Sequence, residues 1–133
     1  MNADPLKVFR RQGIERHTDA TTPKQSGRAP YQAFTTKEKL GRVEIRMKDG
    51  FSHAPGYNFL LDIYFEHAEQ TGILLVTSFA CIKILGRNLL PIAQALQRHQ
   101  CERLVEFNPT EYDPPTDASA PFIESIGLRG GRS

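Results

Sequence analysis

The feature that most constrains the fold is a long apolar stretch, followed by a helix pattern, at residues 72–107. Two largely apolar runs, 73–76 and 79–85, are separated only by Thr77 and Ser78. A run that is apolar on both faces is typical of a central strand covered on both sides. Since a strand usually has about five or six residues, we expect a bend or bulge between the two runs of this long strand.

The same stretch does not predict a membrane span. A transmembrane helix needs about 20 consecutive apolar residues. Lys83 and Arg87 interrupt the stretch before that length, and its β-branched residues favour a strand. We therefore predict a small soluble domain that has no membrane partner.

A short helix and another strand follow. Gly86 is expected to form a tight turn, and Asn88 to cap the helix, because its side-chain oxygen can accept from first-turn N–H groups. Pro91 suits the first turn, where it loses no hydrogen bond. The apolar side chains recur with helical spacing and form one stripe: Leu89, Ile92, Ala93 and Leu96. The sequence predicts a helix over residues 88–99 and a strand at residues 104–107.

Two alternating segments precede the apolar stretch. Apolar and charged residues alternate over residues 43–48, and Asp49-Gly50 is a strong turn signal. Residues 51–55 are expected to form a loop, and residues 57–65 the next strand. One set of alternate positions in that strand is wholly apolar and is expected to face the core: Phe59, Leu61, Ile63 and Phe65. We expect these two strands and the central strand to form an antiparallel meander.

The predicted fold is an α+β domain over residues 40–128, in the order strand-strand-strand-helix-strand-strand. A mostly antiparallel sheet of about four or five strands is covered on one face by a single short helix, and a last short strand begins near Phe122. One helix cannot cover both faces of the sheet. The second face therefore needs the N-terminal arm, the 108–121 loop or another subunit, which favours a homo-oligomer, either a dimer or a ring.

The charge is distributed unevenly along the chain. Residues 1–39 carry a net charge of +4 and the remainder −2, which gives the net +2 of the whole chain. Residues 1–39 are poor in large apolar side chains, so we expect a basic, largely disordered N-terminal arm. Arg10 and Arg11 in this arm are candidates for contact with nucleic acid. Residues 129–133 are expected to form a flexible C-terminal end.

The cysteines and the N-terminus indicate the compartment. Cys81 and Cys101 form no Cys-x-x-Cys motif or disulfide framework, so we expect two reduced thiols. The first residues lack the apolar core of a signal peptide. We therefore predict a cytoplasmic protein.

No motif predicts a catalytic, metal or cofactor site, so none is assigned. An alternative polar site would use four residues: His53, Asp62, Tyr64 and His67. Metal-binding spacings such as His-x-x-x-His are absent around them. Because these spacings are absent, a solvated loop between strands is favoured over a metal site.

The segment Gly86-Arg87-Asn88 is the other candidate site. It is predicted to lie between a strand and a helix N-terminus, where backbone N–H groups favour anions. Arg87 would add positive charge there. The phosphate-loop pattern Gly-x-Gly-x-x-Gly is absent, so an ordinary turn remains the simpler interpretation.

Two segments together resemble the Sm-like fold of RNA-binding ring proteins. They are VEIRMKDGFSHAPGYNFLLDIYF at residues 43–65 and CIKILGRNLLPI at residues 81–92. Matching positions in that family help to hold an RNA base between subunits. The resemblance implies this role for four residues: Asp62, Tyr64, Gly86 and Asn88. A predicted helix stands where that family has a strand.

Three functional hypotheses follow. The first is a non-enzymatic, oligomeric binding or accessory module, which the absence of a catalytic constellation favours. The second is a nucleic-acid-binding protein that uses the basic arm and the Gly86–Asn88 segment. The third is a small enzyme with His53, Asp62 and His67 in one pocket.

Overall fold

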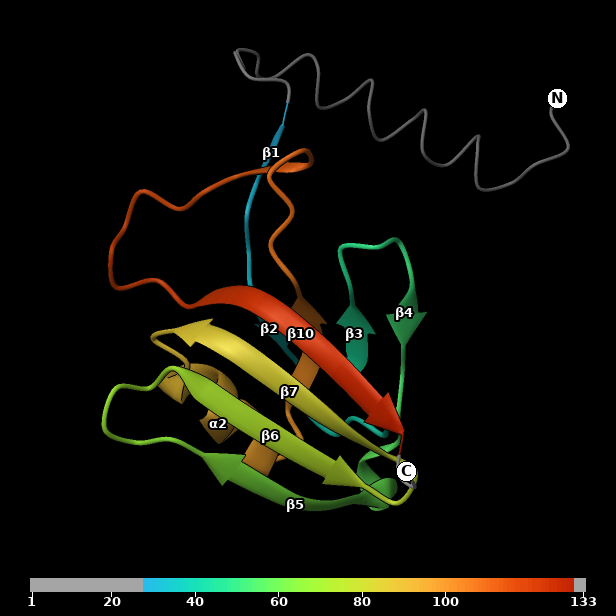
Figure 1. Cartoon of the computed structure of the whole chain (residues 1–133). Coiled ribbons are helices and arrows are strands. Elements are labelled where there is room, and N and C mark those ends of the chain that lie inside the picture. The colour runs from blue at the N-terminus through green and yellow to red at the C-terminus, as the bar shows by residue number, and fades with distance from the viewer. Residues whose placement is uncertain (1–27, 131–133) are drawn as a thin grey trace, which may run out of the picture.

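The computed structural model describes residues 28–130, which form two four-stranded sheets, a two-stranded sheet and a helix (Figure 1). The first four-stranded sheet has the order β10-β7-β6-β5, with β5 at Leu60–Phe65, β6 at Gly72–Thr77, β7 at Ala80–Arg87 and β10 at Phe122–Gly130. The second has the order β2-β8-β3-β4, with β2 at Phe34–Thr36, β3 at Glu44–Arg46, β4 at Ser52–His53 and β8 at Cys101–Val105. The short strands β1 (Ala29–Pro30) and β9 (Tyr112–Asp113) pair in parallel. A 3₁₀ turn at Tyr57–Phe59 precedes β5, and helix α2 (Leu90–Gln97) joins β7 to β8.

The hydrophobic core lies behind the first sheet as it is viewed in Figure 1, where α2 and the second sheet cover it. The first sheet, the second sheet and α2 all contribute side chains that are at most 2% exposed: Ile73, Leu75, Ile82, Ile84, Ile45, Leu104, Ile92 and Leu96. The α+β class is therefore confirmed in outline, and residues 28–130 contain one α-helix. The number and arrangement of the strands differ from the prediction.

The long apolar stretch forms a hairpin, so the prediction of one central strand was wrong. β6 and β7 pair antiparallel, and the two residues that join them are Ser78 and Phe79. The Thr77 hydroxyl closes this turn, because it accepts from Ala80 N at 2.9 Å and donates to Ala80 O at 2.8 Å. Threonine and serine favour such local bonds with the backbone. They therefore mark a reversal of the chain here.

Helix α2 begins and ends within the predicted range, and its apolar stripe is buried as expected. Two details of its N-terminus were wrong. Gly86 is a residue of β7 and forms no turn, and the helix is preceded by Leu89 as the N-cap. Asn88 instead adopts a left-handed backbone with φ 56°, and its side-chain amide donates to Ala118 O and Ala120 O. The chain turns at Asn88.

The meander consists of β5, β6 and β7, whereas the strand predicted at residues 43–48 lies in the other sheet as β3. The Asp49-Gly50 turn is confirmed, with φ 97° at Gly50. It joins β3 to β4, a short strand within the predicted loop at residues 51–55. The register of β5 against β6 shifts between Leu60 and Asp62. This irregularity changes the expected alternation and leaves Leu61 exposed.

The fold includes residues that the sequence assigns to the flexible ends. Residues 28–39 contribute β1 and β2, which pair with β9 and β8. At the other end, β10 is longer than the predicted short strand and includes Arg129 and Gly130. The remainder of the predicted arm, with Arg10 and Arg11, and residues 131–133 lie outside the described residues.

Candidate interaction face

The first sheet has two faces that differ in what covers them. The alternation along each strand sends Ile73, Leu75, Ile82 and Ile84 to the core. The strand register sends the neighbouring residues to the opposite side, which we call the outer face. The outer face consists of Asp62, Tyr64, Gly72, Leu74, Val76, Cys81, Lys83, Leu85, Ser125, Gly127 and Arg129. No element within residues 28–130 lies in front of this face in Figure 1.

The outer face is apolar at its centre and is exposed. Tyr64 is 58% and Leu85 39% exposed, while Leu74, Val76 and Cys81 between them are partly exposed. A hollow of about 420 Å³ lies at the end of the face that is near Gly72. Its lining includes Tyr64, Leu74, Lys83 and Leu85, and the missing side chain of Gly72 leaves the space open.

A second hollow of about 400 Å³ lies toward the opposite corner of the face. Leu74 and Lys83 separate it from the first hollow, and Gly127 gives it a floor without a side chain. A β-carbon on Gly127 would have no heavy atom within 4 Å. Both hollows therefore arise where a glycine interrupts a row of larger side chains.

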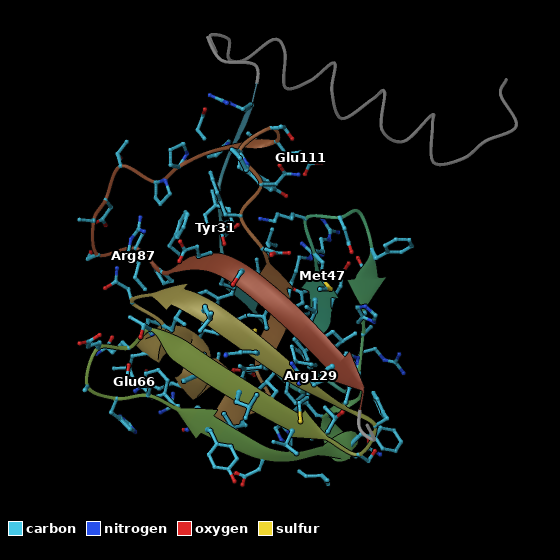
Figure 2. All side chains as sticks on the ribbon, viewed as in Figure 1. Tyr31, Met47, Glu66, Arg87, Glu111 and Arg129 are labelled. Atoms are coloured by element: carbon cyan, nitrogen blue, oxygen red, sulfur yellow. The ribbon has the colours of Figure 1, made fainter. Side chains whose placement is uncertain are left out.

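Charged side chains occupy the edges of the outer face. Asp62 lies on the edge strand β5 and Arg129 on the edge strand β10, in the same row across the sheet. Lys83 lies near the centre. Figure 2 shows Arg129 at one end of β10 and Glu66 at the opposite end of the sheet, beside the turn that follows β5. Asp62 thus lies on the β5 side of the face, and Lys83 and Arg129 lie on the β7 and β10 side, where Glu124 at the bulge of β10 is also exposed.

The Gly86–Asn88 segment has structural partners in the described part of the chain. A β-carbon on Gly86 would come within 1.9 Å of Phe122 O, so this residue allows β10 to approach β7 closely. The Arg87 guanidinium carbon lies 4.2 Å from the centroid of the Phe122 ring. The Asn88 side chain holds carbonyl groups of the loop before β10. Each of the three residues therefore has a structural role that does not require a bound anion.

The four residues of the alternative polar site are not brought together. His53 lies on β4 in the second sheet, whereas Asp62 and Tyr64 share the outer face on β5. His67 lies in the turn after β5, where its ring contacts Phe65 with 4.7 Å between centroids. No metal-binding group of three or more His, Cys, Asp or Glu occurs among residues 28–130. Nucleic-acid contact through Arg10 and Arg11 stays a prediction, because they lie outside this range.

A third, more polar hollow of about 310 Å³ lies beside β3, β4 and β9. Two of its carboxylates, those of Glu44 and Glu106, have partners within the chain. Glu44 accepts from Arg46 at 2.9 Å and from Arg103 at 3.0 Å; burial raises its pKa, but these hydrogen bonds lower the pKa by more. Glu106 accepts from two backbone N–H groups, those of Lys48 and Ile126. Glu44 and Glu106 therefore stabilise the fold, and their carboxylate oxygens are already engaged within the chain.

The two cysteines differ in access. Cys101 is fully buried, and this burial raises its thiol pKa to about 12. The Tyr57 hydroxyl accepts from Cys101 N at 3.1 Å and donates to Cys101 O at 2.6 Å, which fixes the backbone there. Cys81 lies on the outer face and is partly exposed. Cys81 is therefore a natural reporter of whether the outer face is covered.

No protein-family model, curated protein or solved structure matches this chain. The resemblance to the Sm-like fold therefore stays a prediction. In the structure, β6 lies between Asp62 and Tyr64 on β5 and Gly86 on β7. No helix within residues 28–130 is long and apolar enough to cross a membrane.

The sequence did not identify the outer face as a defined surface, although it indicated that one face lacked a cover. The missing signal was the hairpin. Once Thr77 and Ser78 are taken as the reversal, alternate residues of 72–76 and 81–85 fall on the same side. This pairing would have placed the apolar residues and Gly72 on one surface.

Proposed function

We propose that this domain is a non-enzymatic binding module and that its contact surface is the outer face. The observation that supports this proposal is the apolar centre of that face, which has no cover within residues 28–130. Monomeric soluble proteins rarely expose large contiguous apolar patches, and such patches are typical of interaction sites. The aromatic ring of Tyr64 and the aliphatic side chains of Leu74 and Leu85 are suited to a protein partner.

The charge pattern fits the same function. Charged groups are depleted in the centre of protein interfaces and enriched at their rims. Asp62 and Arg129 lie on the edge strands, and apolar side chains lie between them. Lys83 is the exception, but a lysine stem can pack on apolar neighbours while its ammonium group reaches water.

Photo-crosslinking in cells of the source organism tests this function. Tyr64→p-benzoylphenylalanine places the crosslinker on the outer face, on the edge strand β5 beside the apolar centre, where an aromatic ring is already tolerated. Illumination is expected to yield a covalent protein adduct. The adduct is expected to disappear when Leu85→Glu is added, because a charge in the apolar centre opposes desolvation of the interface. Gel mobility and mass spectrometry of the adduct give the result.

Phe51 provides the matched control, since it is a still more exposed aromatic residue, next to β4 in the second sheet. Phe51→p-benzoylphenylalanine is expected to yield no comparable adduct. Equal yields at Tyr64 and Phe51, or an adduct that survives Leu85→Glu, would contradict the proposed function.

A further inference from the structure

The outer face is complementary to itself. Three rows of side chains cross the first sheet, and the strand register defines each row. The first row is Asp62, Val76, Cys81 and Arg129. The second is Tyr64, Leu74, Lys83 and Gly127. The third contains Gly72, Leu85 and Ser125. When each row is compared with the same row read in the opposite direction, at least one large side chain stands opposite a small one, or an acidic group opposite a basic one.

We propose that the outer face binds the same face of a second copy of this chain, about a two-fold axis that runs parallel to the strands between β6 and β7. This inference rests on the proposed function and names its partner. A rotation about that axis keeps each row in place but reverses its direction. The β5 side of one copy then lies over the β10 side of the other.

The reversed rows match in shape. Leu85 of one copy lies over Gly72 of the other, where the hollow of about 420 Å³ is open. Tyr64 lies over Gly127, where the second hollow of about 400 Å³ is open. A protruding side chain therefore meets a glycine at both positions. Because the axis is two-fold, each of these contacts occurs twice.

The reversed rows also match in charge and polarity. Asp62 of one copy meets Arg129 of the other, and this pair also occurs twice. Within one chain the two residues lie at opposite edges of the four-stranded sheet, which are roughly 14 Å apart. Val76 meets Cys81, and Leu74 meets the stem of Lys83. Two sheets packed face to face in this way are a common arrangement of β-proteins.

The size of the face predicts a reversible dimer. Four strands spaced about 4.8 Å apart, with about six residues each, cover roughly 400 Å² on each copy. Stable complexes usually bury about 800 Å² per partner. We therefore expect a dissociation constant in the micromolar range and a mass that depends on concentration.

The first experiment is sedimentation equilibrium of the full chain from about 5 to 500 μM at low salt, a range that brackets the expected dissociation constant. The expected mass rises from the 15.0 kDa of one chain to twice that value. A constant mass of one chain would overturn the dimer, and so would a ring larger than two chains. A Tyr64 adduct with a different protein would then leave the proposed function intact.

A charge exchange tests the orientation of the two copies. Asp62→Arg or Arg129→Asp alone is expected to raise the dissociation constant at least about tenfold, because each change places like charges together twice. The double variant restores opposite charges and is expected to return to within about threefold of the original value. Glu38→Arg changes the net charge by the same amount as Asp62→Arg, at an exposed position outside this sheet, and is expected to leave the dissociation constant unchanged. A dimer that ignores both single changes, or a double variant that stays weak, would overturn this pairing.

Alkylation of Cys81 provides an independent measurement on the unmodified chain. In the proposed dimer Cys81 lies opposite Val76, so its alkylation rate is expected to fall as the concentration passes the dissociation constant. Cys101 does not interfere, because it is fully buried and its pKa is raised to about 12. A Cys81 rate that stays constant while the mass doubles would place the dimer contact elsewhere and overturn the proposal.

Discussion

The two faces of the first sheet both carry apolar side chains along β6 and β7, but the environments of these side chains differ. On the inner face, Ile73, Leu75, Ile82 and Ile84 are at most 2% exposed. On the outer face of the same strands, Tyr64 is 58% and Leu85 39% exposed. One face is covered by α2 and the second sheet, and no element within residues 28–130 covers the other. The comparison shows that apolar alternation selects a face for burial but does not specify what covers it.

The difference also separates two contributions to free energy. Burial of a Val, Leu, Ile, Phe or Met side chain contributes about 1.5–3 kcal/mol. For the inner face this contribution belongs to the folding of one chain. For the outer face, this contribution would be gained on association in the proposed dimer. Substitutions on the inner face should therefore change unfolding, whereas substitutions on the outer face should change the oligomeric state.

The largest expected effect concerns two glycines of the same sheet. Gly86 continues the inner side of β7 beyond Ile84, and Gly127 lies on the outer face of β10. Gly86→Ala would place a β-carbon within 1.9 Å of the backbone oxygen of Phe122, which cannot move without breaking the β7–β10 pairing. We expect a loss of at least about 4 kcal/mol in the free energy of unfolding, measured by urea denaturation.

Gly127→Ala is the matched control for that substitution. A β-carbon there has no heavy atom within 4 Å, and alanine loses less conformational entropy than glycine on folding. At a protein concentration that keeps the chain monomeric, we expect the free energy of unfolding to rise, by no more than about 1 kcal/mol. Equal losses at both glycines would remove the distinction between the two faces.

The next effect compares adjacent residues of β7. Ile84 is fully buried, whereas Leu85 projects from the outer face. Ile84→Ala is expected to cost about 3 kcal/mol of unfolding free energy, because it leaves a cavity in a packed core. Leu85→Ala is expected to cost less than about 1 kcal/mol in the monomer and to raise the dissociation constant of the dimer. Denaturation and sedimentation on the same samples test both statements, and a similar unfolding cost at the two positions would contradict them.

Local patterns were enough to predict several elements of the fold. The buried face of α2 was predicted by the apolar stripe of Leu89, Ile92, Ala93 and Leu96. The turn between β3 and β4 was predicted by Asp49-Gly50. Both depend on contacts between residues that are near in sequence. The hairpin at Thr77 and Ser78 was missed, because an apolar run of this length is compatible with one long strand or with two.

Non-local features were beyond these patterns. Nothing near Ile45 indicates that β3 pairs in parallel with β8, because the partner residue Leu104 is far away in sequence. The role of Gly86 depends on the backbone of Phe122, which is also distant in sequence. The outer face also depends on contacts between residues that are distant in sequence. Its rows combine β5, β6, β7 and β10, so the match of Asp62 with Arg129 becomes visible only when the strand register is known.

The smallest expected effect compares an interior carboxylate with one on the outer face. Glu106 is 6% exposed, and its two oxygens accept from Lys48 N at 2.8 Å and Ile126 N at 3.0 Å. It thus joins β10 to the chain that follows β3. Glu106→Gln replaces one acceptor with a donor that faces an N–H group. We therefore expect the free energy of unfolding to fall by about 2 kcal/mol. Asp62→Asn should leave the free energy of unfolding of the monomer nearly unchanged, because within residues 28–130 the Asp62 carboxylate accepts only from the adjacent Ile63 N. Urea denaturation of both variants measures the difference, and an equal loss would show that the outer face contributes to the fold of the single chain.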